Sequence, residues 1–362
     1  MKRIKVVIVD DSSVIRNIVR EVLSLDEQIE VVGEAKDPFV ARDLIKELNP
    51  DVITLDVEMP KMDGITFLRN LMRLRPMPVV MLSTLTTQGA DITLQALEIG
   101  AFDFIAKPSF ESLVENRNLF AQELTDKVKS AVSVDRKNYA LINSLKSSED
   151  NTTLAFTGAA RANHLIAIGA STGGTEAIRE VVTRMPNNAP PIVITQHIPE
   201  TFSERFANRL NSSCDVTVQE AQHGQKIKEG NVYIAPGNKH LKVVSKSGSL
   251  FCVLDDGPEV NRHRPSVDVL FDSLTEIADN VQAILLTGMG QDGASGMKRL
   301  KDNGAYTIVQ DQASSLIWGM PGSAYAQNAH CVDCTLQKIA KCALSHAQRD
   351  RKSMKEAVAA YE

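Results

Sequence analysis

A serine flanked by glycines stands out near the middle of the chain. Residues 169–173 read Gly-Ala-Ser-Thr-Gly, which places the hydroxyl of Ser171 between two glycines. An apolar stretch, residues 165–168, precedes them, and a helical pattern begins near Thr175. A G-x-S-x-G turn between a strand and a helix exposes a serine hydroxyl at the end of a parallel sheet. The pattern predicts a nucleophile, although a phosphate- or dinucleotide-binding turn also fits this stretch taken alone.

Two further polar residues follow apolar stretches of strand length. His197 comes directly after residues 191–196, and Asp292 follows residues 283–288. If these stretches are parallel strands of one sheet, both residues share the carboxyl edge of that sheet with Ser171. A neutral imidazole can take the proton of a serine hydroxyl, and a buried carboxylate orients the imidazole. We therefore expect a Ser171–His197–Asp292 triad that carries out acyl transfer.

Backbone donors complete the predicted site. N–H groups near Thr172 and in the turn around Met289 are the expected oxyanion donors. The chain order serine, histidine, aspartate differs from that of α/β-hydrolases, so the serine motif does not predict their fold. A dinucleotide site is disfavoured because the glycines do not follow the G-x-G-x-x-G spacing and no acidic ribose ligand stands at the expected distance.

In the first third of the chain, polar side chains end successive apolar stretches. Five such stretches alternate with helical periodicity, which predicts a doubly wound parallel sheet. The residues at their ends are Asp10, Asp11, Asp56, Ser83 and Lys107. Because the carboxyl ends of parallel strands share one edge, we expect these side chains to lie together. Carboxylate oxygens suit Mg²⁺, and the metal and the lysine would neutralise a phosphoryl group during its transfer to a carboxylate.

This pattern resembles the receiver domain of two-component response regulators over about the first 120 residues. The resemblance implies that a sensor histidine kinase phosphorylates Asp56. It also implies that the backbone carbonyl of Glu58 joins Asp10, Asp11 and Asp56 as a ligand of Mg²⁺. Ser83, Phe104 and Lys107 would be the switch residues, and the loops at this edge would shift on phosphorylation.

Composition narrows the class of protein. The chain has 362 residues, of which 43% are hydrophobic and 23% charged, and its formal net charge is −5. These values are typical of a soluble two-domain protein and disfavour nucleic-acid binding. No apolar run is long enough to span a membrane and no signal peptide is evident, so we expect a cytoplasmic protein without membrane insertion. The 5 cysteines fit a reducing compartment. Cys331 and Cys334 form a lone C-x-x-C pair, which is weak support for zinc.

A polar stretch without apolar periodicity, residues 146–153, predicts a linker between two domains. The expected divisions are a receiver domain over residues 1–125, a linker over 126–160, a catalytic domain over 161–350 and a tail over 351–362. Two apolar stretches around Lys246 and Gly248 predict a β-hairpin in the second domain. The predicted fold is a five-stranded, flavodoxin-like receiver domain joined to a Rossmann-like α/β domain with an antiparallel hairpin.

Four motifs of the second domain together resemble the chemotaxis protein-glutamate methylesterase family. They are residues 169–174, 196–202, 264–268 and 286–293. That family hydrolyses methyl esters of glutamate on chemoreceptor helices and deamidates selected glutamines there. The resemblance implies the same roles for the triad, places Thr172 and Met289 at the oxyanion site, and requires no cofactor for ester hydrolysis. Residues 318–321 and 264–265 look like pocket walls, although Trp318 equally fits a core aromatic.

The combined resemblance implies an esterase that is activated by phosphorylation. The unphosphorylated receiver would cover the edge that carries Ser171, and phosphorylation of Asp56 would weaken that contact. The implied partners are methyl-accepting chemoreceptors as substrate and the chemotaxis sensor histidine kinase as phosphodonor. A DNA-binding output would need a compact basic helix-turn-helix module, whereas the second half is long, sheet-rich and acidic. A phosphorylation-controlled scaffold with a vestigial triad is the alternative that stays open.

Overall fold

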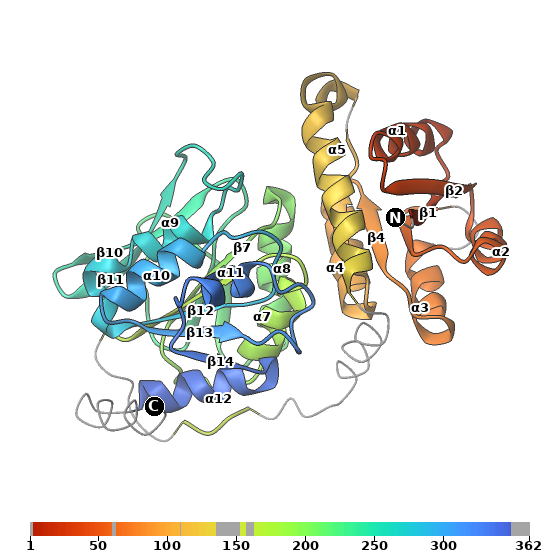
Figure 1. Ribbon diagram of the computed structural model, residues 1–362. Coiled ribbons are helices and arrows are strands. Elements are labelled where there is room, and N and C mark those ends of the chain that lie inside the picture. The colour runs from red at the N-terminus through yellow and green to blue at the C-terminus, as the bar shows by residue number, and fades with distance from the viewer. Residues whose placement is uncertain (1–2, 60–62, 109, 135–152, 157–162, 349–362) are drawn as a thin grey trace. The chain divides into compact units, whose positions relative to one another are not determined.

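The computed structural model divides into two compact units, Met1–Glu149 and Asp150–Glu362. It describes residues 3–59, 63–108, 110–134, 153–156 and 163–348, with only the backbone of residues 110–116. Each unit contains its own parallel sheet with helices between the strands (Figure 1). No helix in the described part of the chain is long and apolar enough to cross a lipid bilayer.

The first unit is built on a five-stranded sheet in the order β2-β1-β3-β4-β5. Its strands are β1 (Ile4–Val9), β2 (Ile29–Ala35), β3 (Val52–Asp56), β4 (Val79–Ser83) and β5 (Asp103–Ala106). Its helices are α1 (Ser13–Ser24), α2 (Pro38–Leu48), α3 (Gly64–Leu74), α4 (Thr87–Ile99) and α5 (Phe110–Ser133). All neighbouring strands are parallel, which confirms the predicted doubly wound sheet. The strand order reverses between β1 and β3, which is where ligands bind in such sheets.

A polar side chain caps the N-terminus of each of the first four helices of this unit. The capping oxygens belong to Ser12, Asp37, Asp63 and Thr86, and each accepts a hydrogen bond from a backbone N–H of the first helical turn. Such caps satisfy N–H groups that have no partner inside the helix. The last helix, α5, continues to Ser133 and therefore past residue 125, the expected end of the domain.

The second unit is built on a seven-stranded parallel sheet in the order β14-β13-β12-β6-β7-β9-β8. Its strands are β6 (Leu165–Ala170), β7 (Ile192–Gln196), β8 (Thr217–Glu220), β9 (Asn231–Ile234), β12 (Val281–Leu285), β13 (Tyr306–Gln310) and β14 (Val332–Cys334). The strands that follow β6 in the chain, β7 to β9, lie toward one edge of the sheet. The chain then returns to β12, on the other side of β6, and continues to β13 and β14 toward the opposite edge. The edge beside β6 is therefore a switch point, where a ligand site is expected.

Helices cover both faces of this second sheet (Figure 1). They are α7 (Gly174–Val182), α8 (Glu200–Asn211), α9 (Val267–Asp272), the 3₁₀ helix η1 (Thr275–Asn280), α10 (Ala294–Asp302), α11 (Met320–Ala326) and α12 (Leu336–Ala347). The apolar positions of β6, β7 and β12 are buried throughout. Strands covered on both faces are apolar without alternation, which is why the sequence marks them clearly.

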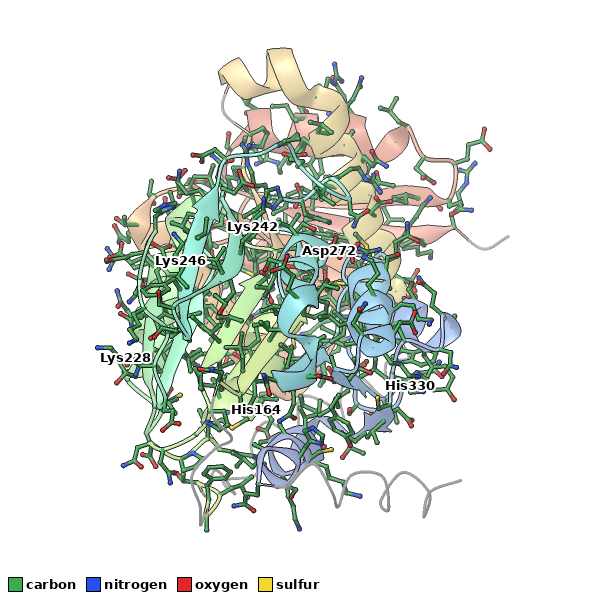
Figure 2. The ribbon with its side chains drawn as sticks, turned by 90° about the vertical axis from the view of Figure 1, so that its left-hand side faces the viewer. His164, Lys228, Lys242, Lys246, Asp272 and His330 are labelled. Carbon is green, nitrogen blue, oxygen red and sulfur yellow. The ribbon has the colours of Figure 1, made fainter. Side chains whose placement is uncertain are left out.

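An antiparallel hairpin stands apart from the parallel sheet, as predicted. It consists of β10 (His240–Lys246) and β11 (Ser249–Asp255), and Lys242 and Lys246 lie along it (Figure 2). Ser247 and Gly248 form its turn, with φ angles of 49° and 75°. Positive φ at both central residues is the geometry that two-residue hairpins favour.

Part of the stretch expected to be a linker belongs to the second unit. The hydroxyl of Thr153 donates to Asp215 at 2.8 Å, and the N–H of Leu154 donates to the carbonyl of Arg184 at 3.0 Å. The side chain of Phe156 is buried. Residues 153–156 are therefore anchored to the second unit, while the expected tail, residues 351–362, lies outside the described residues.

Candidate active site

Ser171 follows β6 directly, in the turn that leads to α7. Its N–H donates to the carbonyl of Thr287 at 3.1 Å, and its carbonyl accepts from the N–H of Gly174 at 2.7 Å. Gly173 has a φ of 75°, a conformation that glycine adopts without strain. A Cβ on Gly174 would lie 2.1 Å from Oε1 of Gln196. Both glycines are therefore needed by the turn that presents the serine.

Three side chains at the carboxyl ends of three neighbouring strands form a hydrogen-bonded row. His197 follows β7, and Asp292 lies between β12 and α10. Nδ1 of His197 lies 3.1 Å from Oγ of Ser171, and Nε2 lies 2.9 Å from Oδ2 of Asp292. The side chains of His197 and Asp292 are only 7% and 2% exposed. A proton acceptor thus stands beside the serine hydroxyl and a carboxylate stands on the other side of the ring, as nucleophile activation requires.

The carboxylate of Asp292 is held by several donors besides His197. They are Nδ2 of Asn261 at 2.7 Å, Oγ of Ser266 at 2.8 Å, and the N–H groups of Val267 at 2.7 Å and Asp268 at 3.2 Å. Burial opposes the charge, but the hydrogen bond and charge of His197 and the hydrogen bonds from Asn261 and Val267 outweigh it and hold the pKa of Asp292 below its usual value. The group therefore stays ionised, so that it can orient the imidazole and stabilise the imidazolium.

The two segments expected to supply oxyanion donors lie beside the serine. Thr172 is the next residue, and its carbonyl accepts a hydrogen bond from the hydroxyl of Thr287 at 3.0 Å. A Cβ on Gly288 would lie 2.9 Å from Cβ of Ser171 and 2.3 Å from Sδ of Met320. The turn that carries Met289 therefore packs at the serine, and Met320, in the segment of residues 318–321, packs against Gly288 of this turn.

Trp318 is anchored by its indole as well as by its backbone. It forms a β-bridge with Gly288, and its Nε1–H donates to the carbonyl of Gln310 at 3.2 Å. The ring is partly exposed and lies tilted against Tyr325, with ring centroids 5.5 Å apart. Its expected role as a pocket wall stays a prediction.

Sequence reasoning missed two residues that contact the row. Asn261 binds Asp292, and the ring of His263 stacks on that of His197 with centroids 3.6 Å apart and an interplanar angle of 16°. Neither residue ends a strand, and neither lies in a motif that the sequence marks. They belong to a tight turn whose central residues are Asn and Arg, without the glycine that would have signalled it.

A second cluster lies at the carboxyl ends of β1, β3 and β5 in the first unit. Carboxylate oxygens of Asp10, Asp11 and Asp56 all lie within 4.8 Å of one another. Nζ of Lys107 lies 2.9 Å from Oδ2 of Asp10 and 2.7 Å from Oδ1 of Asp56. Burial raises the pKa of Asp56 to about 6, although Lys107 favours the charged form. The structure thus brings together four of the residues that the sequence placed at this edge.

The donor set of this cluster fits a hard divalent cation. Oδ2 of Asp56 is buried and has no hydrogen-bond partner among the described residues. Two further carboxylates lie beside it, and oxygen ligands of this kind suit Mg²⁺. The N–H of Glu58 donates to Oδ1 of Asp56 at 3.1 Å, which brings the backbone at residue 58 next to the cluster.

The expected switch residues have other partners in this structure. The hydroxyl of Ser83 is buried and lies 2.6 Å from Oγ1 of Thr93 and 3.3 Å from the carbonyl of Gly89, both on α4. Phe104 is buried, and Nζ of Lys127 lies 5.3 Å from the centre of its ring. Ser83 is therefore bonded to α4, and its predicted response to a phosphoryl group stays a prediction.

Comparison with known proteins places both units in families. The model of the response regulator receiver domain matches residues 6–117, and the CheB methylesterase model matches residues 166–343. The Thermotoga maritima CheB methylesterase catalytic domain has a crystal structure that covers 51% of this chain and 98% of its own, with 35% identity and a TM-score of 0.50.

Two curated relatives match along nearly their whole length. The protein-glutamate methylesterase/protein-glutamine glutaminase 2 of Saccharophagus degradans is 49% identical over 348 residues, which are 96% of this chain and 99% of that protein. The protein-glutamate methylesterase/protein-glutamine glutaminase 1 of Hahella chejuensis is 52% identical over 341 residues, which are 93% and 94% of the two chains. The chain, which joins a receiver domain to a methylesterase domain, therefore belongs to the protein-glutamate methylesterase/protein-glutamine glutaminase family.

Proposed function

We propose that this chain is a phosphorylation-activated serine hydrolase of bacterial chemotaxis. It demethylates glutamate methyl esters on chemoreceptors and deamidates certain glutamines there, which gives adaptation. The observation that carries the proposal is the hydrogen-bonded row of Ser171, His197 and Asp292. The names of the relatives contain the same two activities. The proposed setting is the cytoplasm, with methyl-accepting chemoreceptors as substrate and the chemotaxis sensor histidine kinase as phosphodonor.

In the proposed reaction, Nδ1 of His197 takes the hydroxyl proton while Oγ of Ser171 attacks the ester carbonyl. The Nε2–H of the ring stays bonded to Asp292, which stabilises the imidazolium. The N–H groups of Thr172 and Met289 are the proposed donors to the oxyanion of the tetrahedral intermediate. As this intermediate collapses, the imidazolium returns its proton to the departing oxygen and methanol leaves.

The second half of the reaction removes the acyl group from the enzyme. Water attacks the acyl carbon and gives its proton to Nδ1 of His197, and a second tetrahedral intermediate forms. Its collapse releases the glutamate carboxylic acid, which ionises, and the imidazolium returns the proton to Oγ of Ser171. With a glutamine substrate the same steps release ammonia in place of methanol. No step requires a cofactor.

The first unit is proposed to accept the regulatory phosphoryl group on Asp56. The proposed Mg²⁺ ligands are Asp10, Asp11, Asp56 and the backbone carbonyl of Glu58, and the bound ion would offset the charge of the phosphoryl oxygens. The unpartnered oxygen of Asp56 and the close carboxylates support this assignment. Lys107 would move from its two aspartates to the phosphoryl group, and Ser83 and Phe104 would respond to it.

Methanol release from methyl-esterified chemoreceptor tests both halves of the proposal. Native protein and Ser171→Ala are each assayed with and without acetyl phosphate and Mg²⁺. We expect release by the native chain to rise with the phosphodonor and release by Ser171→Ala to fall to background. Equal release by the two proteins would contradict the assignment of Ser171 as nucleophile. Failure of a fluorophosphonate to label Ser171 would favour a scaffold with a vestigial triad.

A further inference from the structure

A tight turn lies beside the row of Ser171, His197 and Asp292. The N–H of Val260 donates to the carbonyl of His263 at 3.1 Å, and the N–H of His263 donates back at 3.0 Å. The two central residues, Asn261 and Arg262, have φ angles of 54° and 66°. This is the geometry that glycine favours in two-residue turns. Asn adopts this conformation more readily than most residues, whereas Arg262 is strained there, and such strain persists where the surrounding contacts require it.

Asn261 joins two buried carboxylates through one amide nitrogen. Its Nδ2 donates to Oδ1 of Asp292 at 2.7 Å and to Oδ2 of Asp268 at 2.8 Å. The other oxygen of Asp268 accepts from the N–H of Gly296 at 2.6 Å. Burial raises the pKa of Asp268, and the nearby charge of Asp292 raises it further. The two acidic groups would repel each other without a donor between them, so the amide offsets this repulsion and, together with the other donors to Asp292, holds its carboxylate in place.

His263 covers one face of the proposed base. Its ring is nearly parallel to that of His197, with centroids 3.6 Å apart. Both nitrogens of His197 are engaged in the plane of the ring, with Ser171 and Asp292. A stacked ring leaves these in-plane hydrogen bonds intact but resists rotation of the imidazole out of the plane. Among the described residues, Asp292 is hydrogen-bonded to His197, Asp268 is linked to Asp292 through Asn261, and His263 stacks on the ring.

We propose that the turn of residues 260–263 is a positioning element of the active site, in which Asn261 holds Asp292 and His263 holds the ring of His197. The proposal rests on the proposed function and assigns two positioning residues to the same reaction. Neither side chain transfers a proton in the mechanism above. One short segment thereby positions both His197 and Asp292, which follow two different strands.

The first test substitutes Asn261. A residue that only forms the turn and a residue that positions Asp292 predict different effects of these substitutions on kcat. Asn261→Gly suits the positive φ, so a mere turn residue would tolerate it, whereas loss of the amide should lower kcat roughly 10- to 100-fold. Asn261→Asp replaces the donor with a third carboxylate and should lower kcat at least as much. KM for methyl-esterified receptor should stay unchanged in both, because neither side chain is assigned to substrate binding.

The second test asks whether the flat ring of His263, or only the space that it fills, is needed for kcat. His263→Phe keeps a flat ring over His197 and should retain kcat within about twofold, whereas His263→Leu fills the space without a plane and should lower kcat about fivefold to tenfold. The matched control is Ser247→Gly in the exposed turn of the β10–β11 hairpin, where φ is 49°. This control should leave kcat unchanged. All variants are made in the full chain and assayed with saturating acetyl phosphate and Mg²⁺.

A readout that does not need catalysis distinguishes failure of this proposal from failure of the proposed function. The proton that joins Nε2 of His197 to Asp292 is followed by nuclear magnetic resonance, together with its exchange with water. We expect slow exchange in native protein and His263→Phe, and fast exchange in His263→Leu and Asn261→Gly. Slow exchange and native kcat in these last two variants would overturn the proposal. Lost activity with slow exchange would also overturn it, whereas absent activity in native protein would contradict only the proposed function.

Discussion

At the scale of single residues, the proposed chemistry depends on which ring nitrogen of His197 meets which partner. Nδ1 faces Ser171 and Nε2 faces Asp292, so a neutral ring must carry its proton on Nε2 to be a base for the serine. The ionised carboxylate of Asp292 selects that tautomer, because an anion can only accept a hydrogen bond. The hydrogen bonds that hold Asp292 therefore also determine the protonation of the base.

Replacing the carboxylate of Asp292 by an amide tests this dependence. Asp292→Asn keeps the size of the side chain but can stabilise the wrong tautomer, so kcat for methanol release should fall about 10³- to 10⁴-fold. The control is Asp272→Asn at the end of α9 (Figure 2), where an exposed ion pair with Arg299 contributes little. A loss below about tenfold in Asp292→Asn would contradict the assigned role.

The buried Asp56 leads to a prediction about stability and pH. Burial raises its pKa from 3.8 to about 6 in the folded chain. Protonated Asp56 therefore contributes stability that is complete below about pH 4 and is lost as pH rises through about 6. At pH 7 without Mg²⁺, Asp56→Asn should be more stable than the native chain by about 3 kcal/mol.

Urea unfolding in EDTA at several pH values measures the difference in unfolding free energy between Asp56→Asn and the native chain. Hydrogen exchange of β1 and β3 monitors the unfolding of the first unit. We expect it to vanish below about pH 4 and to shrink when Mg²⁺ is added at pH 7, because a bound cation offsets the charge. A difference between the two proteins that does not vary with pH would contradict the predicted titration.

At the scale of elements, the turn between β6 and α7 determines where Ser171, the proposed nucleophile, lies. Gly173 in this turn is surrounded by side chains, unlike Gly248, which has the same φ angle. Gly173 and Gly248 both have a φ of 75°, but a Cβ on Gly173 would lie 2.8 Å from Cδ2 of Leu316, whereas Gly248 has nothing within 4 Å. A side chain at Gly248 would therefore cause backbone strain alone, whereas a side chain at Gly173 would cause the same strain and also crowd the active site.

Alanine at these two glycines gives a matched pair of variants. Gly248→Ala should lower the free energy of unfolding by about 1–2 kcal/mol through strain alone and leave kcat unchanged. Gly173→Ala adds crowding, so it should lower stability by about 2–4 kcal/mol and reduce kcat at least tenfold by displacing Ser171. Urea unfolding and methanol release measure both quantities. Equal kcat in the two variants would show that the turn tolerates a side chain.

Two strands that the sequence did not predict are short and lie at the edges of the second sheet. The strands β8 and β14 are four and three residues long, and their sequences, Thr-Val-Gln-Glu and Val-Asp-Cys, have mixed polarity. An edge strand packs fewer apolar side chains than a central one, so hydrophobic periodicity marks it weakly. The central strands were predictable because they are buried on both faces.

At the scale of the whole molecule, the chemistries proposed for the two units need different conditions. The proposed phosphoryl transfer uses Mg²⁺, whereas the proposed ester hydrolysis uses side chains and backbone alone. EDTA should therefore abolish the stimulation of methanol release by acetyl phosphate and leave the basal rate unchanged, and excess Mg²⁺ should restore the stimulation. Asp56→Asn should behave as the native chain does in EDTA. Loss of the basal rate in EDTA would indicate a metal in the hydrolytic site.

The local pattern of the chain was enough to predict the edge of each sheet at which the candidate residues lie. Ser171, His197, Asp10 and Asp56 each follow or end an apolar stretch, and parallel strands bring their carboxyl ends to one edge whatever their order. The family motifs point to the same residues. The alternation of helices and strands likewise predicted both sheets and the hairpin, because periodicity is a local property of the chain.

The contacts between these side chains could not be predicted from the sequence, because they depend on the folded arrangement of the elements. Asn261 lies 31 residues before Asp292, and Ser83 turns to Thr93 on α4, contacts that depend on packing between separate elements. The turn of residues 260–263 lacks a central glycine because its central residues are Asn and Arg, and the stacking of His263 on His197 joins residues that lie far apart in the sequence. Long-range contacts of this kind arise from the assembled fold, because no periodicity in the chain encodes which distant side chains meet.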